Sequence, residues 1–325
     1  MVKRVAIVGC GRVGGKRARA LGDSRLVAVA DADPQRARRL AAEQSGCEAE
    51  ADWRAAVARP DVEVVIVATT NDGLAPVARA AAEAGKHVLV EKPGARSAAE
   101  LGPVAAAARE RGVTVRVGFN HRFHPALRRA RALVQDGALG PLMYVRGRYG
   151  HGGRPGYERE WRARPEVAGG GELLDQGVHL IDLARWFAGD LALVAGHVQT
   201  FFWDAPVEDN GFVLLRGRGG QVAWLHASWT EWKNLFSFEV FGRQGKLEVD
   251  GLGGSYGVER LTHYRMRPEM GPPETSGWEY PGEDPSWADE YASFVEATLG
   301  RDTPNATLDD AAAALGIVGE AYGRA

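Results

Sequence analysis

The pattern of apolar and polar residues changes near residue 120, and the part before it has the order of an α/β protein. Short runs rich in β-branched residues alternate there with alanine-rich stretches that favour helices. This order is typical of a parallel sheet covered by helices. Pro34 and Pro76 fit first-turn positions in such helices, where a missing N–H costs nothing. The strands that we predict cover residues 3–9, 25–31, 62–69, 86–91 and 113–119, and the helices begin near Arg12, Pro34, Asp52, Asp72 and Ser97.

Beyond Phe119 the pattern is that of an α+β domain with a large, mainly antiparallel open sheet. A predicted helix over 125–135 is followed by strand-like segments, several of which have no helix between them. We interpret 251–285, rich in Gly, Pro and Glu, as a long loop, and expect closing helices from about Ser286 and Leu308. The predicted domains are residues 1–120 and 121–325. The strand-like segments cover residues 141–149, 191–203, 210–217, 220–230 and 235–251.

Composition narrows the class of protein. A chain of 325 residues with 45% hydrophobic and 25% charged residues has room for two globular domains. A net charge of −2 gives no electrostatic footprint for a nucleic acid or an anionic membrane, and no apolar run approaches the ~18 residues of a membrane span. Two cysteines and no signal-peptide pattern predict reduced thiols and a cytoplasmic location. No Cys/His cluster has zinc spacing, so we expect no metal.

A glycine-rich turn after the first predicted strand indicates a Rossmann-type, dinucleotide-binding domain. Gly9, Gly11 and Gly14 have G-x-G-x-x-G spacing, which allows a tight turn, approach of a pyrophosphate and close helix–strand packing in that order. The helix N-terminus offers its N–H groups to the phosphates. Asp31, at the end of the second strand, suits a ribose 2′-hydroxyl and repels a 2′-phosphate, so NAD is favoured over NADP. Arg36 is a nearby cation that would weaken this preference, and a glycine turn that binds nothing is the alternative.

Glu91 and Lys92 form a second candidate, at the end of the strand over 86–91. Ligands of open α/β sheets bind outside the carboxyl ends of the strands, so both residues are expected at the mouth of the cofactor crevice. A lysine there can hydrogen-bond a substrate hydroxyl and stabilise negative charge on its oxygen during hydride transfer. The alternative is a solvated surface lysine.

The segment 171–187, GELLDQGVHLIDLARWF, reads as an apolar helix with polar residues set into it. Asp175 and His179 are four residues apart and therefore share one helical face. They are either a general base with its orienting acid or a structural pair, and the helix alone leaves both open. Asp182 is interpreted as structural.

The polar segment 148–171 precedes this helix and is a candidate substrate loop. Its side chains would bind hydroxyls or phosphates of a polyol, or else form a solvated loop. The segment SWTEWKN, 228–234, would approach a sugar ring, or serve sheet packing or a subunit contact. The loop residues in question are Tyr149, His151, Arg154, Tyr157 and Arg162.

Taken in order, these motifs resemble the glucose–fructose oxidoreductase / inositol dehydrogenase / rhizopine-catabolism (Gfo/Idh/MocA) family. The resemblance rests on GCGRVG, VADAD, ATTND, VLVEKPGA, VGFNHRFHP and GGGELLDQGVHLIDLARWF, and the last of these ends at residue 187. One departure is that the family's T-P-N-x-x-H loop reads TTNDGL over 69–74, without the proline and the histidine. The departure bears on that loop's contacts and not on the fold.

The resemblance implies roles for named residues. Lys92 matches the family's catalytic lysine, and Asp175 and His179 match the acid and base of its dehydrogenases. Lys92–Pro93 matches a bond that is often cis. The residues expected to contact substrate are Lys92, Arg122, Tyr149, His151, Tyr157, Asp175 and His179. The residues expected to line the cofactor are Gly9, Gly11, Arg12, Val13, Gly14, Asp31, Arg36, Thr69, Thr70, Asn71, Glu91, Lys92, Asn120, Trp161 and Arg162.

We therefore predict an NAD-dependent oxidoreductase acting on a secondary alcohol or ketone of a sugar, nucleotide-sugar or cyclitol. His179 takes the hydroxyl proton, Asp175 orients the imidazole, and Lys92 holds the same oxygen. Two alternatives stay open: an NAD-dependent, redox-neutral glycoside hydrolase and a non-catalytic dinucleotide-binding regulator. We expect no nucleic-acid or membrane partner, and a homodimer or homotetramer formed through the exposed face of the large sheet.

Overall fold

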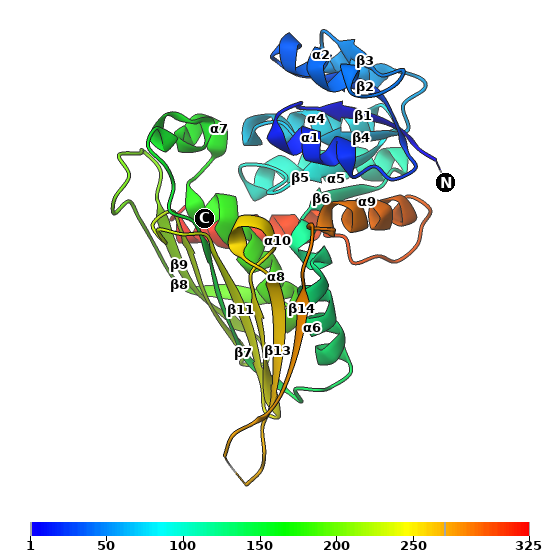
Figure 1. Ribbon diagram of the computed structural model, residues 1–325. Coiled ribbons are helices and arrows are strands. Elements are labelled where there is room, and N and C mark those ends of the chain that lie inside the picture. Colours follow the sequence, from blue (N-terminus) through cyan, green and yellow to red (C-terminus); the bar gives the residue numbers. More distant parts are fainter. Residues whose placement is uncertain (1, 270, 325) are drawn as a thin grey trace. The chain divides into compact units, whose positions relative to one another are not determined.

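The computed structural model describes residues 2–269 and 271–324, which form two compact units (Figure 1). Unit 1 contains residues 2–120, Glu166–Gly169 and Trp287–Leu315, and unit 2 contains His121–Pro165, Gly170–Ser286 and 316–324. Each unit has a sheet of its own. Within the described parts of the chain, no helix has the length and hydropathy needed to cross a membrane.

Unit 1 is built on a six-stranded parallel sheet with the strand order β3-β2-β1-β4-β5-β6. The order reverses between β1 and β4, and in such sheets ligands bind at the carboxyl ends of the strands beside that reversal. The strands are β1 (Arg4–Val8), β2 (Arg25–Ala30), β3 (Glu48–Glu50), β4 (Val64–Val67), β5 (His87–Glu91) and β6 (Val115–Gly118). The helices are α1 (Arg12–Arg19), α2 (Pro34–Ala42), α3 (Trp53–Ala58), α4 (Asn71–Glu83), η1 (Ala98–Glu100) and α5 (Leu101–Arg111), together with all but the first residue of α7 (Pro165–Ala168) and α9 (Ser286–Ala297).

The predicted parallel sheet is confirmed, and its strands β1, β2, β4 and β5 are buried on both faces. Every residue of β4 is fully buried, as expected for a continuous apolar run with helices on either side. The edge strand β3 was not predicted, because its sequence Glu-Ala-Glu contains no apolar run. Late in the chain, α9 adds Tyr291, Phe294 and Val295 to the core that contains Ile7 of β1.

The two prolines behave differently. Pro34 is the first residue of α2, behind the N-cap Asp33, as predicted. Pro76 lies inside α4, so its predicted first-turn position is wrong. The helix begins at Asn71, well before the proline, and an interior proline supplies no N–H to the carbonyl four residues earlier, here that of Asp72.

Unit 2 is built on an eight-stranded sheet with the order β14-β13-β12-β11-β7-β10-β9-β8. Only the central β7–β10 pair is parallel among the strands described, so the sheet is mainly antiparallel, as predicted. The helix α8 packs on β7 and β10, and α6 packs on β12, β13 and β14. The strands are β7 (Leu142–Gly150), β8 (Leu191–Gln199), β9 (Asn210–Gly217), β10 (Val222–Ser228), β11 (Leu235–Gly242), β12 (Gly245–Asp250), β13 (Glu259–Arg265) and β14 (Glu274–Tyr280). The helices are η2 (Asn120–Phe123, beginning in unit 1), α6 (Pro125–Gln135), η3 (Tyr157–Arg159), η4 (Trp161–Ala163), the π-helical turn η5 (Leu173–Gly177), α8 (Val178–Ala188), η6 (Gly254–Tyr256) and the end of α10 (Leu308–Ala321), which starts in unit 1.

The prediction of a long loop over 251–285 is wrong, because this segment contains β13 and β14. The strand β13 alternates buried and accessible residues, with Glu259, Leu261 and His263 buried. Because two of these buried residues are polar, the alternation of apolar and polar residues that predicts a strand is not visible in the sequence. Glu259 is tolerated there because its carboxylate accepts hydrogen bonds from His124 and from the backbone of Ala126.

Two other strand predictions differ in extent. The segment predicted over 191–203 leaves the sheet after β8, because the carboxylate of Asp209 accepts the backbone N–H groups of Phe201, Phe202 and Trp203. The segment predicted over 235–251 is a hairpin, β11 and β12, which turns at Arg243 and Gln244.

Candidate active site

The glycine turn of unit 1 has the geometry of a phosphate cradle. Gly9 has a φ of +97°, and a Cβ on it would lie 2.3 Å from the carbonyl oxygen of Ala68. A Cβ on Gly14 would lie 1.9 Å from the carbonyl oxygen of Gly9. At Gly11, by contrast, a Cβ would meet nothing within 4 Å. The outer glycines are required by the fold, whereas the middle one leaves open space at the N-terminus of α1, where phosphate binding is favoured.

Asp31 lies beside this turn, directly after β2. Its Oδ2 accepts a hydrogen bond of 2.6 Å from the N–H of Cys10, and its Oδ1 accepts one of 2.8 Å from the N–H of Asp33. These bonds fix the carboxylate next to the glycine turn. Arg36 is directed to Asp33, with 3.4 Å between Nε and Oδ2.

The TTND segment at the start of α4 is held by its own side chains. The hydroxyl of Thr70 donates to Asp72 over 2.5 Å, and that of Thr69 donates to the carbonyl of Thr70 over 3.0 Å. The side-chain amide of Asn71 is buried and donates to the carbonyl of Ala168 over 2.8 Å. Local hydroxyl bonds therefore order this loop, which lacks the family's proline and histidine.

Glu91 is locked into a buried ion pair. Its Oε1 accepts from Arg17, whose Nε and Nη2 lie 2.6 and 2.5 Å away, while Nη1 of Arg17 lies 2.6 Å from Oε2 of Glu290. Burial alone would lower the pKa of Arg17, but the two carboxylates raise it. The next residue, Lys92, is half-buried at the carboxyl end of β5, and the Lys92–Pro93 bond is cis, which confirms the expectation from the resemblance. Asn120, the last residue of the first segment of unit 1, is buried.

In unit 2, the segment with Asp175 and His179 begins with a π-helical turn. Asp175 lies in η5 and His179 in the first turn of α8. Oδ2 of Asp175 lies 2.9 Å from Nε of Arg162, a residue of η4. The attraction of Asp175 raises the pKa of Arg162. This pairing was not predicted, although both residues were singled out, because no periodicity relates residues on different elements.

The imidazole of His179 is buried and stacked. Its centroid lies 3.8 Å from that of His121, with 26° between the rings. Tyr149 meets both rings at an angle, and its burial raises the pKa of its hydroxyl well above the usual range. His121 was not among the predicted site residues. Its place in NHRFHP, directly after a strand end, is the feature of the sequence that could have identified it.

Arg122, the residue after His121, forms a buried ion pair with Asp182 of α8. Nε and Nη2 of Arg122 lie 2.8 and 2.5 Å from the two carboxylate oxygens of Asp182. Both side chains are almost completely buried. The geometry favours a supporting role for the pair, with Arg122 holding the segment next to His121 against α8.

The candidate substrate loop is partly built into the core. Tyr157 is buried edge-on to Trp229, with 4.8 Å between centroids, and His151 lies 5.5 Å from Tyr157. Burial lowers the pKa of His151. The ring of Trp161 is covered by the guanidinium of Arg162 at 4.5 Å. Trp229 is fully buried and thus serves packing, whereas Trp232 is 64% exposed.

The predicted residues thus form two groups, one in each unit. In unit 1, the glycine turn, Asp31, the TTND segment and Glu91–Lys92 follow the carboxyl ends of the parallel strands. In unit 2, Asp175 meets Arg162 and His179 meets His121. Across residues 2–269 and 271–324, no group of three or more His, Cys, Asp or Glu side chains could hold a metal ion.

Comparison with known proteins finds matches for both units. Residues 3–119 match the family model described as oxidoreductase family, NAD-binding Rossmann fold, and residues 127–248 match that of the GFO/IDH/MocA C-terminal domain. Levoglucosan dehydrogenase of Pseudarthrobacter phenanthrenivorans is 36% identical over 196 residues, which are 59% of this chain and 50% of that protein. The match therefore spans half the length of that relative.

Two further proteins match over more of their length. A dTDP-3,4-didehydro-2,6-dideoxy-alpha-D-glucose 3-reductase of Saccharopolyspora spinosa is 31% identical over 251 residues, which are 76% of this chain and 74% of the reductase. The crystal structure of GenD2 from gentamicin A biosynthesis, in complex with NAD, has a TM-score of 0.84 and 29% identity, and the match covers 99% of this chain and 94% of that one.

Proposed function

We propose, because this chain belongs to the GFO/IDH/MocA family of oxidoreductases with an NAD-binding Rossmann fold, that it oxidises or reduces a CH–OH group of a sugar, nucleotide-sugar or cyclitol. The observation that carries the proposal is the pairing of the open space at Gly11, at the N-terminus of α1, with the fixed carboxylate of Asp31. The similarity to proteins named as a levoglucosan dehydrogenase and a nucleotide-sugar 3-reductase supports the substrate class.

Unit 1 supplies the proposed cofactor site. The N–H groups at the start of α1 bind the pyrophosphate, and Gly11 leaves room for it. Asp31 binds the ribose hydroxyls and repels a 2′-phosphate, so NAD is preferred to NADP. The bound nicotinamide supplies the hydride acceptor or donor.

The chain's own residues handle the proton and the charge on the reacting oxygen. In the oxidation direction, Lys92 hydrogen-bonds the substrate oxygen and stabilises the negative charge that develops there. His179 takes the hydroxyl proton as general base. Asp175 orients and stabilises the imidazolium that forms, and Arg162 holds the carboxylate of Asp175. Glu91, held by Arg17, gives Lys92 a rigid support.

Substrate is bound by polar groups of unit 2. Tyr149 and His151 present a neutral hydroxyl and a neutral imidazole near neutral pH, given the directions of their pKa shifts. Such groups donate to or accept from sugar hydroxyls without a charge of their own. Free Cys10 and Cys47 support a cytoplasmic location.

The outer face of the eight-stranded sheet is the proposed surface for a homodimer or homotetramer. Trp224 on β10 is 44% exposed, between Arg146 of β7 and Leu214 of β9. On the same sheet, Tyr144 stacks on Phe241 at 4.2 Å. An exposed aromatic sheet face favours association with a second copy.

The test is NADH formation or consumption with a panel of inositols, free sugars, anhydrosugars and nucleotide-sugars, with each mixture also analysed by mass spectrometry. Turnover of one class is expected, and Lys92→Ala should abolish it while NAD affinity changes by only a few-fold. Lys92→Arg keeps the charge but not the point-like ammonium and should recover little activity. Product without net NADH would instead favour the redox-neutral hydrolase. Full turnover by Lys92→Ala would contradict the assignment.

A further inference from the structure

Glu208 holds the start of the helix that carries Asp175 and His179. Its Oε2 accepts the N–H of Gly171 over 3.0 Å, and its Oε1 accepts the N–H of Leu173 over 3.1 Å. The backbone carbonyl of Glu208 accepts the N–H of Glu172 over 3.1 Å. One residue from a different segment thus binds three consecutive N–H groups where the helical segment begins.

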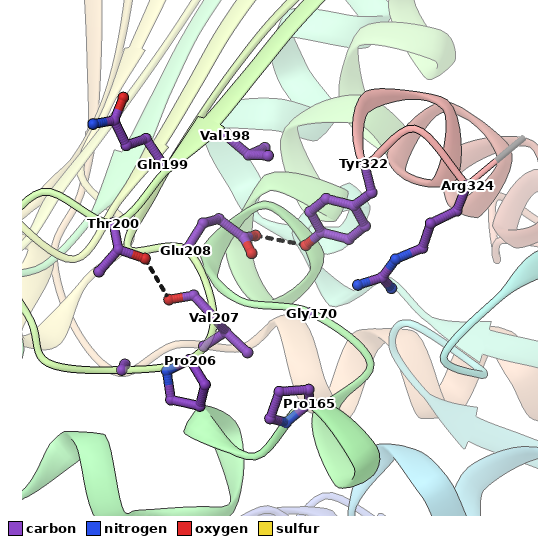
Figure 2. A pocket seen from close by; sticks show the side chains of 11 residues that line it. Pro165, Gly170, Val198, Gln199, Thr200, Pro206, Val207, Glu208, Tyr322 and Arg324 are labelled. Atoms are coloured by element: carbon purple, nitrogen blue, oxygen red, sulfur yellow. Dashed lines mark hydrogen bonds between the residues drawn. The ribbon is translucent and has the colours of Figure 1, made fainter.

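Tyr322, just beyond α10, fixes Glu208 in turn. Its hydroxyl donates to Oε1 of Glu208 over 2.5 Å, as Figure 2 shows. Glu208 is 9% exposed, and burial raises the pKa of its carboxyl. The carboxylate can sit there because the backbone N–H groups and the tyrosine hydroxyl replace its water.

The glycine run before the helix is explained by this contact. A Cβ on Gly170 would lie 2.3 Å from the hydroxyl of Tyr322, and a Cβ on Gly171 would lie 2.0 Å from the backbone oxygen of Glu208. Only residues without a side chain allow Glu208 and Tyr322 to approach this closely.

The helix start that Glu208 binds is also hydrogen-bonded to Asp175, the proposed orienting acid. The carbonyl of Gly171 accepts the N–H of Asp175 over 2.9 Å, so the residue that Glu208 binds also sets the backbone of Asp175. The carboxylate of Asp175 then meets Arg162. A shift of the helix start moves Asp175 relative to Arg162, and displacement of a catalytic group by about 1 Å can lower the rate about 100-fold.

We infer that Glu208 and Tyr322 are positioning residues for Asp175 and His179, acting by anchoring the N-terminal turn of their helix. This inference rests on the proposed function for its effect on turnover. It adds two residues outside the family motifs, one from the loop before β9 and one from the end of the chain.

The variants Glu208→Gln and Tyr322→Phe test the inference. The glutamine presents an NH₂ group to one of the two N–H donors, and the phenylalanine loses only a hydroxyl. A cavity of about 370 Å³, lined by Pro165, Thr200, Pro206 and Arg324 among others (Figure 2), borders the pair, so water has room to replace the hydroxyl and the variants should fold. Gln199→Ala, which changes another wall of this cavity, is the matched control.

Two readouts are measured on the full chain. We expect kcat to fall by about 10- to 100-fold in Glu208→Gln and by less in Tyr322→Phe, with KM within about threefold and NAD affinity unchanged. We also expect hydrogen exchange of the Leu173 and Asp175 amides to become at least about tenfold faster, while amides of α6 keep their rates. Gln199→Ala should match the unmodified protein in both.

The inference and the proposed function fail in different ways. Unchanged amide exchange at Leu173 and Asp175 in Glu208→Gln would overturn the anchoring role whether or not a substrate is known. Faster exchange with an unchanged kcat would overturn its importance for the reaction. A parent protein that turns over no member of the panel would count against the proposed function and leave the exchange readout valid.

Discussion

Nε of Arg162 lies 2.9 Å from Oδ2 of Asp175, and this ion pair links a short 3₁₀ turn to the helical segment of the proposed base. If it holds Asp175 in place, Arg162→Leu should lower kcat by about 10-fold or more, because a partly buried carboxylate loses its counter-charge. Steady-state kinetics with the identified substrate measure this. Arg159→Leu removes an exposed partner of Glu158 in the same loop and should change kcat less than twofold. Equal effects of the two variants would argue against a special role for Arg162.

Asp31 should determine the choice between NAD and NADP. In Asp31→Asn, we expect the ratio of kcat/KM for NAD to that for NADP to fall by about tenfold or more, because the repulsion of a 2′-phosphate and charge-assisted bonds to the ribose are lost together. Asp52→Asn, at the N-cap of α3, should leave the ratio unchanged. A ratio that stays constant in Asp31→Asn would place the selectivity elsewhere.

Cys10 should react slowly with alkylating reagents. Burial, with Asp31 nearby, raises the pKa of its thiol from 9.0 to about 12, and burial raises that of Cys47 to about 11. A raised thiol pKa makes the reactive thiolate scarce below that pH, so the rate should rise about tenfold per pH unit from pH 7 to pH 10. Iodoacetamide labelling followed by mass spectrometry measures both sites. NAD should protect Cys10, which lies in the glycine turn, and leave Cys47 unaffected. Equal labelling of Cys10 with and without NAD would contradict the proposed cofactor position.

Replacing Arg17 with an apolar residue should strongly destabilise the protein. It is fully buried between Glu91 and Glu290, so Arg17→Leu leaves two buried carboxylates without their cation and should lower the free energy of unfolding by about 3–5 kcal/mol. Urea denaturation measures the loss. Arg79→Leu removes an exposed pair with Glu83 and should cost no more than about 0.5 kcal/mol. A small effect at Arg17 would mean that water reaches the carboxylates.

Trp224 should matter for assembly if the open sheet face joins two copies. We expect Trp224→Glu to shift the mass measured by light scattering toward that of a single chain, because a carboxylate replaces apolar area at the centre of the contact. Leu299→Glu, at a similarly exposed apolar residue of unit 1, should leave the mass unchanged. A parent protein that is already a single chain would rule out this interface.

Most of the parallel sheet was predictable because the strands β1, β2, β4 and β5 are buried on both faces and have apolar runs. The edge strand β3 of the six-stranded sheet and the strand β13, next to the edge strand β14 of the eight-stranded sheet, were harder to predict. The strand β3 has no apolar residue except one alanine, and β13 places Glu259 and His263 at buried positions where apolar residues are expected. Their burial depends on partners from distant segments, such as His124, which no local pattern reveals.

Candidate residues were easier to find than their partners. Spacing singled out Asp175 and His179, but the ion pair with Arg162 and the stack with His121 join segments that the sequence does not relate. Glu208 gave no signal at all, since its role depends on three backbone N–H groups of another segment.

Unit 1 includes residues 287–315, which are synthesised after almost all of unit 2. Until they leave the ribosome, Arg17 lacks Glu290, and the apolar core lacks Tyr291 and Phe294. For most of its synthesis, a nascent chain therefore contains the whole glycine turn while the core of unit 1 is incomplete. A chain that terminates before residue 287 therefore lacks part of the core of unit 1, although the glycine turn itself is present. Nucleotide binding would thus distinguish chains that contain residues 287–315 from chains that end before them.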